Sequence, residues 1–139
     1  MLRTITVAMA LSLAAAGASA ADPDLNDQVQ TYQGAQFMCT GISEEARNNP
    51  ALDAYALKLQ FSTVEGDFVA NVQTTVRDAS GAVVLQADCF SPWLLADLGP
   101  GEYRVSATAE TGETREATVS VQSGKQVSQV IQFPSVKDT

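Results

Sequence analysis

Two cysteines carry the clearest chemistry in this chain. Cys39 and Cys89 are the only cysteines among its 139 residues. In an exported protein of this size, such a pair favours a structural disulfide, which would stabilise the fold by about 4 kcal/mol through chain entropy. Two free thiols with a redox role are the alternative, but redox pairs are usually close in sequence, as in Cys-x-x-Cys. We therefore predict a Cys39–Cys89 disulfide.

Catalytic groups are scarce. The chain contains no histidine, which removes the usual general base, the Ser-His and Cys-His nucleophile systems and nearly all catalytic zinc sites. Glu44 and Glu45 are adjacent on a predicted helical turn, and the other acids are scattered among turns. The run Asp78-x-Ser80-Gly81 offers one carboxylate, whereas calcium takes six to eight oxygens. We expect no enzymatic activity, no cofactor and no metal.

Two aromatic residues are the candidates for ligand contact. Trp93 is the only tryptophan and lies in the apolar run Pro92-Trp93-Leu94-Leu95-Ala96. An exposed tryptophan can serve as a platform for a sugar ring or a peptide. A lone tryptophan in an apolar run is more typical of the core, where strands change sheet. Phe90 follows Cys89 and either packs against the disulfide or joins Trp93 in contacting a ligand.

The first twenty residues have the pattern of a cleaved signal peptide. Arg3 gives a short positive start, Ile5 to Ala16 is apolar, and Ala18-Ser19-Ala20 is a small-x-small cleavage site. The apolar stretch is too short for a membrane span. No cysteine precedes Cys39, so a lipid anchor at the cleavage point is not expected. The sequence predicts a mature chain that starts at Ala21 in the periplasm, without membrane insertion.

The charge balance is acidic. Sixteen Asp and Glu against eight Lys and Arg give a net charge of −8, which becomes −9 when Arg3 leaves with the signal peptide. Nucleic acids and anionic lipids are bound by clustered Lys and Arg, so neither is an expected partner. The acids form no block, and their plainest role is solubility. We expect a monomer whose partner is an envelope protein or a glycan.

Alternating apolar residues predict an all-β, seven-stranded antiparallel sandwich. Residues 21–38 are expected to form a polar leader, 39–134 the sandwich and 135–139 a tail, with one short helix near 43–48 capped by Ser43. Turns recur every eight to twelve residues, which is typical of a sandwich. The predicted strands are 55–61, 83–87, 103–107, 117–121 and 127–133, with further apolar residues at the 92–96 corner. Another strand, over 72–78, leads into a tight turn at 79–82; its apolar alternation extends back to Phe68, and Arg77 faces outward. The last strand is either a free edge or a central strand.

Two segments resemble a known family. The string Thr75-Val76-Arg77-Asp78-Ala79-Ser80-Gly81-Ala82-Val83-Val84-Leu85 resembles the V-x-D-x-x-G-x-x-V hairpin of carboxypeptidase-regulatory-like domains. Leu98-Gly99-Pro100-Gly101-Glu102-Tyr103-Arg104-Val105 resembles the L-P-P-G-x-Y-x-V strand that follows it. The resemblance implies a prealbumin-type sandwich (Ig-like or transthyretin-like) related to Cna-B domains.

The resemblance has limits that bear on function. The segments 41–47 and 92–95 resemble those of small, single-domain exported proteins of proteobacteria. Gly99 replaces the usual first proline, and Ser91 stands where glycine is usual. No asparagine follows Asn71, so the Lys–Asn crosslink of some Cna-B domains is not expected. The family signature carries no catalytic residue.

Fold resemblance and the lack of catalytic groups together predict a non-enzymatic module. We expect it to bind a protein or cell-envelope component, or to act as an accessory subunit. Carbohydrate binding through exposed aromatics such as Trp93 is the alternative.

Overall fold

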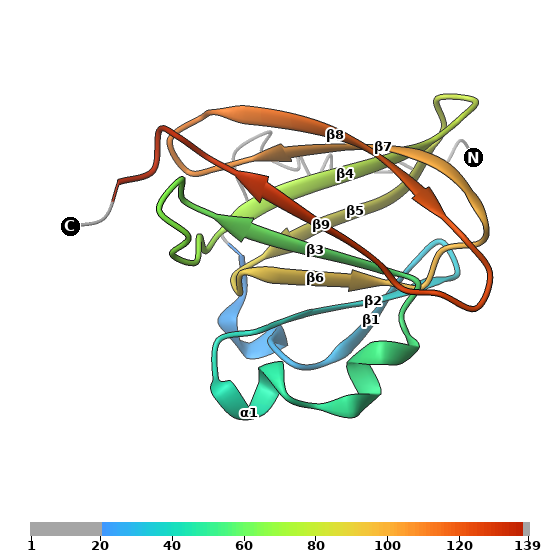
Figure 1. Cartoon of the computed structure of the whole chain (residues 1–139), viewed down its shortest axis with the longest axis horizontal. Coiled ribbons are helices and arrows are strands. Elements are labelled where there is room, and N and C mark those ends of the chain that lie inside the picture. Colours follow the sequence, from blue (N-terminus) through green and yellow to red (C-terminus); the bar gives the residue numbers. More distant parts are fainter. Residues whose placement is uncertain (1–20, 138–139) are drawn as a thin grey trace, which may run out of the picture.

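Two β-sheets pack face to face in the computed structural model, which describes residues 21–137 (Figure 1). The predicted signal peptide, 1–20, and the last two residues of the predicted tail lie outside the described residues. Nine strands form the sheets: β1 (Val29–Tyr32), β2 (Ala35–Thr40), β3 (Leu57–Ser62), β4 (Val72–Asp78), β5 (Val83–Cys89), β6 (Trp93–Ala96), β7 (Gly101–Thr108), β8 (Thr114–Val121) and β9 (Val127–Gln132). Three short helices accompany them: η1 (Pro23–Leu25), α1 (Glu44–Arg47) and η2 (Pro50–Ala54).

The sandwich is all-β, but its strand count differs from the expected seven. One sheet has the order β1-β2-β6-β3-β9 and the other β5-β4-β7-β8. The first sheet is not wholly antiparallel, because β9 pairs with β3 in parallel, with Leu57 opposite Val127 and Ser62 opposite Gln132. This pairing also answers the question about the last strand, which lies at the edge of the five-stranded sheet.

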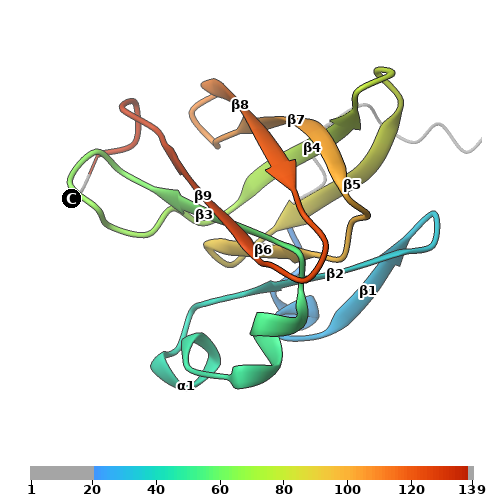
Figure 2. The same cartoon turned by 45° about the vertical axis from the view of Figure 1, so that its right-hand side comes forward.

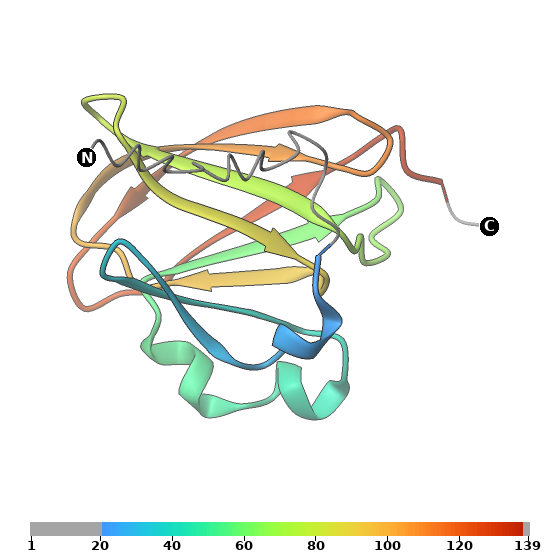
Figure 3. The same cartoon turned by 180° about the vertical axis from the view of Figure 1, so that it is seen from behind.

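The additional strands come from the segment expected to be a polar leader and from the apolar corner. Residues 29–40 form the β1–β2 hairpin, in which Tyr32 pairs with Ala35. Its turn residues, Gln33 and Gly34, have φ angles of 47° and 87°, the positive values that two-residue hairpin turns require. The predicted corner is β6, which pairs with both β2 and β3. Seen from behind (Figure 3), the β1–β2 hairpin lies near β5 of the opposite sheet.

The main core lies between the sheets and follows the period of two predicted for the central strands. Leu57, Leu59 and Phe61 on β3 point inward and are fully buried, as are Val72 and Val76 on β4. The rings of Phe61 and Phe133 lie 6.4 Å apart between centroids at a tilted angle, a favourable geometry for aromatic pairs. Alternation places one apolar set inward on each strand and leaves the intervening residues for the outer faces.

Phe68 does not belong to this core, although the sequence pattern places it in phase with Val72 and Val76. The strand β4 begins only at Val72. Asn71 has a φ of 60°, a left-handed conformation that asparagine tolerates better than most residues. The chain therefore leaves the strand geometry at Asn71, and Phe68 is 53% exposed.

Residues 41–56, which we call the strap, cover the outer face of the five-stranded sheet and carry α1 and η2 (Figures 1 and 2). The predicted helix near 43–48 is present as α1, where the Ser43 hydroxyl accepts a hydrogen bond from the Ala46 N–H. Leu52 of the strap packs against Trp93 and Leu95. The Gln126 side-chain amide donates to the carbonyls of Leu52 and Tyr55, which ties the strap to the loop before β9.

Candidate functional site

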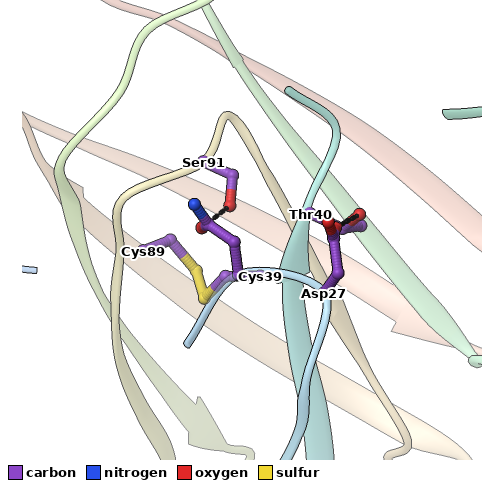
Figure 4. The surroundings of a disulfide bond; sticks show 6 residues. Asp27, Cys39, Thr40, Cys89 and Ser91 are labelled. Carbon is purple, nitrogen blue, oxygen red and sulfur yellow. Dashed lines mark hydrogen bonds between the residues drawn. A yellow bond between two sulfur atoms is a disulfide. The ribbon is translucent and has the colours of Figure 1, made fainter. Parts of the chain in front are cut away.

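The predicted disulfide is present and joins the two sheets. Cys39 at the end of β2 and Cys89 at the end of β5 are bonded, with 5.4 Å between their Cα atoms (Figure 4). Their side chains are buried, and the described residues include no free cysteine. The bond therefore serves the structure, and it fits a protein exported to an oxidising compartment.

Two side-chain hydrogen bonds hold the segment before β1 against the end of the sandwich that carries the Cys39–Cys89 disulfide. The Thr40 hydroxyl donates to the Asp27 carboxylate, and the Ser91 hydroxyl donates to the Asn26 side-chain oxygen (Figure 4). The Asp27 N–H donates to the Cys39 carbonyl at 2.8 Å. Ser91 and Thr40 are buried polar residues, and these bonds satisfy them. Side-chain hydrogen bonds of Asn26 and Asp27 thus stabilise the region around the disulfide, and the sequence pattern did not predict them.

Trp93 is buried, but not between the sheets. It is 7% exposed and lies on the outer face of the five-stranded sheet, in a cluster with Leu52 and Leu95 that Met38 and Tyr55 border. The Lys58 ammonium lies 3.8 Å from the centroid of the Trp93 ring, a cation–π contact. Trp93 therefore helps to hold the strap, not the two sheets. With one side under the strap and a cation over the ring, its indole offers no open platform for a sugar.

Phe90 is half-buried and lines a shallow hollow with Asn71, Val72, Thr108 and Ala109. The Phe90 carbonyl accepts a hydrogen bond from the Asn71 N–H at 3.3 Å. Phe90 and Trp93 belong to different surfaces, since Trp93 lies in the strap cluster. The structure thus does not bring the two candidate aromatics together in one site.

Asp78 acts within its turn. Its carboxylate accepts hydrogen bonds from the Ser80 hydroxyl, the Ser80 N–H and the Ala82 N–H. The hydrogen bond from the Ser80 side chain and those from the backbone hold the pKa of the Asp78 carboxyl below its usual value. Among residues 21–137 no group of three or more His, Cys, Asp or Glu side chains could hold a metal ion.

An exposed apolar surface lies where the strap meets the loop before β4. We call it the Phe68 surface and define it by Ile42, Arg47 and Phe68. Phe68 is 53% exposed and Ile42 is 52% exposed. The Arg47 guanidinium carbon lies 5.2 Å from the centroid of the Phe68 ring, and its Nη1 donates to the carbonyls of Gly41 and Ile42 at 2.9 and 3.0 Å. Arg47 thus connects the backbone of Ile42 to the ring of Phe68.

Sequence reasoning missed this surface because Phe68 continues the apolar alternation of β4. The signal against a core position is Asn71, a poor strand residue directly before the strand. Arg47 was visible only as the last residue of a short helix. Its contact with Phe68 depends on how the strap folds over the sheet, and this is not encoded in local pattern.

Comparisons with known proteins give no further assignment. Neither the scan against protein-family models nor the search of curated proteins returned a match to this chain. The resemblance to carboxypeptidase-regulatory-like domains therefore stays a prediction. No helix within residues 21–137 is long and apolar enough to cross a membrane.

Proposed function

We propose that this chain is a non-enzymatic periplasmic module that binds a protein of the cell envelope through the Phe68 surface. A cleaved signal peptide over residues 1–20 would export it, and the Cys39–Cys89 disulfide supports an oxidising destination. The observation that carries the proposal is the exposed Phe68 ring with Arg47 stacked upon it. The absence of histidine from the whole chain favours binding over catalysis.

The composition of the Phe68 surface matches that of protein–protein interfaces. Aromatic residues and arginine are enriched at interface centres, where a few of them carry most of the binding energy. A ring half exposed to water gains free energy when a partner covers it, at about 25 cal/mol per Å² of apolar area. Isolated exposed aliphatic residues are common on soluble proteins, but an exposed aromatic ring with an arginine stacked upon it is a more specific feature.

The Phe68 surface is also held in place before any partner arrives. Arg47 makes two hydrogen bonds to backbone carbonyls at the start of the strap. The Ser62–Phe68 bridge fixes the backbone of Phe68 beside the end of β3. Because the Arg47 side chain and the Phe68 backbone are already held, less of their freedom is lost on binding, and the entropic cost of association is reduced.

Site-specific photo-crosslinking in cells that export the protein tests the proposal. A photoreactive residue at position 68 should give a discrete adduct of higher mass, and the substitution Arg47→Gln should weaken that adduct. The matched control is position 130, where Val130 of β9 is 46% exposed but lies outside the Phe68 surface. The same adducts at both positions, or none at position 68, would rule out this surface. The mass of the exported protein shows whether it begins at Ala21.

A further inference from the structure

The second sheet has an outer face that carries no apolar cluster. Its outward residues are mostly Thr, Ser and Gln, and no described helix covers it (Figure 2). Two arginines and three acids, Asp88, Glu102 and Glu116, interrupt this polar surface. Arg77 on β4 and Arg104 on β7 occupy directly opposite positions in the antiparallel pair, and both are exposed. Side chains at opposite positions have their Cβ atoms about 5 Å apart and point to the same face.

This arrangement is unexpected in an acidic protein with few cations. Like charges directly opposite each other in a sheet destabilise it, and the whole chain has eight Lys and Arg for sixteen Asp and Glu. Other basic residues have contacts of their own: Arg47 stacks on Phe68, and Lys58 lies over Trp93. Within the described part of the chain, neither Arg77 nor Arg104 forms an ion pair.

The two guanidinium groups border a shallow cavity of about 410 Å³. The turn 78–81, Tyr103 and Thr118 complete its lining, together with Glu102. The Arg77 Nη1 donates to the Gly81 carbonyl at 3.2 Å, which anchors that side chain beside the turn. Thr118 stands opposite Arg104 on β8 and adds a hydroxyl next to the pair.

Acidic residues in the lining differ in how they bear on the cavity. The Asp78 carboxylate accepts hydrogen bonds from donors of its own turn, and these partly offset its negative charge toward a ligand in the cavity. Glu102 lies two residues before Arg104 on the same face of β7. Its negative charge opposes an anionic ligand, and removing it offers a direct test of charge recognition.

We propose that Arg77 and Arg104 bind the phosphate group of a small, soluble phosphomonoester. A guanidinium presents N–H groups in a planar fork that matches phosphate oxygens, and two of them balance the charge of a phosphomonoester, which is about −1.5 to −2 near neutral pH. A single carboxylate needs only one guanidinium. A bilayer rich in anionic lipid is disfavoured, because the chain carries a net charge of −8 and an extended negative surface repels it.

This site is separate from the Phe68 surface. Phe68 precedes the first residue of β4, whereas Arg77 is near the last residue of the same strand. The loop before β4 and the turn after it lie at opposite ends of the sandwich in Figure 1. The phosphate proposal therefore stands or fails independently of the protein partner.

Titration of the isotope-labelled mature protein tests the proposal, with inorganic phosphate and glycerol 3-phosphate as probes. At low ionic strength, about 10–20 mM salt, electrostatic attraction is least screened. We expect saturable NMR shifts of the amides in 77–81 and 102–104 and of Thr118. Arg77→Gln and Arg104→Gln should each weaken binding about tenfold, and Glu102→Gln should strengthen it.

The control variant is Arg115→Gln, since Arg115 is an exposed arginine of the same sheet that stands opposite Ala107. This variant should bind the probes as the unsubstituted protein does, and thermal melting of each variant shows that it is folded. Absence of saturable shifts, or equal binding by the Arg77→Gln/Arg104→Gln double variant, would overturn the site. Tighter binding of succinate would overturn the phosphate assignment, and tighter binding of vesicles containing phosphatidic acid would overturn the soluble ligand.

Discussion

The two faces of the five-stranded sheet are both buried, but by different parts of the molecule. The inner face packs against the second sheet through a large cluster that includes Phe61, Leu94 and Val105. The outer face packs against the strap through Leu52, Trp93 and Leu95. The strand β6 contributes to both, because Leu94 points inward while Trp93 and Leu95 point outward. The same residue types thus stabilise the whole sandwich on one face and a single covering segment on the other.

Phe61→Ala should have the largest effect, because it removes a fully buried ring from the main core and leaves a cavity beside Phe133. We expect a loss of about 3–5 kcal/mol in the free energy of unfolding. Chemical denaturation followed by circular dichroism measures it. A loss below about 1 kcal/mol would show that the inner cluster is not the main source of stability.

Removing the disulfide should come next. In the double variant Cys39→Ala/Cys89→Ala the unfolded chain regains the freedom of a loop with a sequence separation of 50. We expect a loss of about 2–4 kcal/mol. The bond joins the two sheets, so this loss should appear in the global denaturation midpoint under non-reducing conditions. An unchanged midpoint would mean that the hydrogen bonds of Asn26 and Asp27 hold the two sheets together at this end without the disulfide.

Leu52→Ala tests most directly whether the inner cluster and the strap cluster stabilise different parts of the molecule. Leu52 is the buried residue of η2, and its loss should cost about 2 kcal/mol, at the low end for a leucine truncation because the strap is peripheral. Hydrogen exchange should accelerate within the strap while the β3 amides stay protected, and Trp93 fluorescence should shift to the red. The matched control is Leu57→Ala, at a fully buried inner position. Equal acceleration in both regions would contradict the distinction.

Acid should act on exposed turns and not on either cluster, since neither cluster contains a carboxyl group, and the turn of Asp78 is one of these turns. The folded-state pKa of Asp78 is lowered, so its stabilising effect is present above the unfolded-state pKa of about 3.9 and is lost as pH falls through the folded-state pKa. Asp78→Asn should lower the melting temperature slightly near pH 6, and the difference from the unsubstituted protein should shrink as pH falls through the folded-state pKa of Asp78. A difference independent of pH would indicate a steric cause.

The alternation of apolar and polar residues predicted those strands that bury only one of their two faces. The alternation over 55–61 and 103–107 gave the inward residues of β3 and β7 because each strand buries one side only. The segment 92–96 was interpreted as a corner, since a strand buried on both faces has no alternation. The segment expected to be a polar leader contains β1, an edge strand that tolerates polar residues, and most of β2, which pairs with β1 on one side and β6 on the other. The sequence predicted that Trp93 is buried. It did not predict that Leu52 of the strap covers it, because the two residues are distant in the sequence.

The pairing of strands was beyond local reasoning, and so was the surface chemistry. Nothing in residues 127–133 specifies a parallel partner some seventy residues earlier, because register is set by tertiary packing. Arg77 and Arg104 each occupied an expected outward position in a predicted strand. Only the β4–β7 register made them neighbours.

The parallel pairing of β9 with β3 also orders events in time. Strand β3 has the last strand of the sandwich as its neighbour on one side, and Phe133 follows directly to meet Phe61. Until residue 133 has emerged from the ribosome, β3 has an unpaired edge and Phe61 lacks its aromatic neighbour. Contacts between residues so distant in sequence slow folding. The sandwich can therefore complete itself only after almost the whole chain has been released.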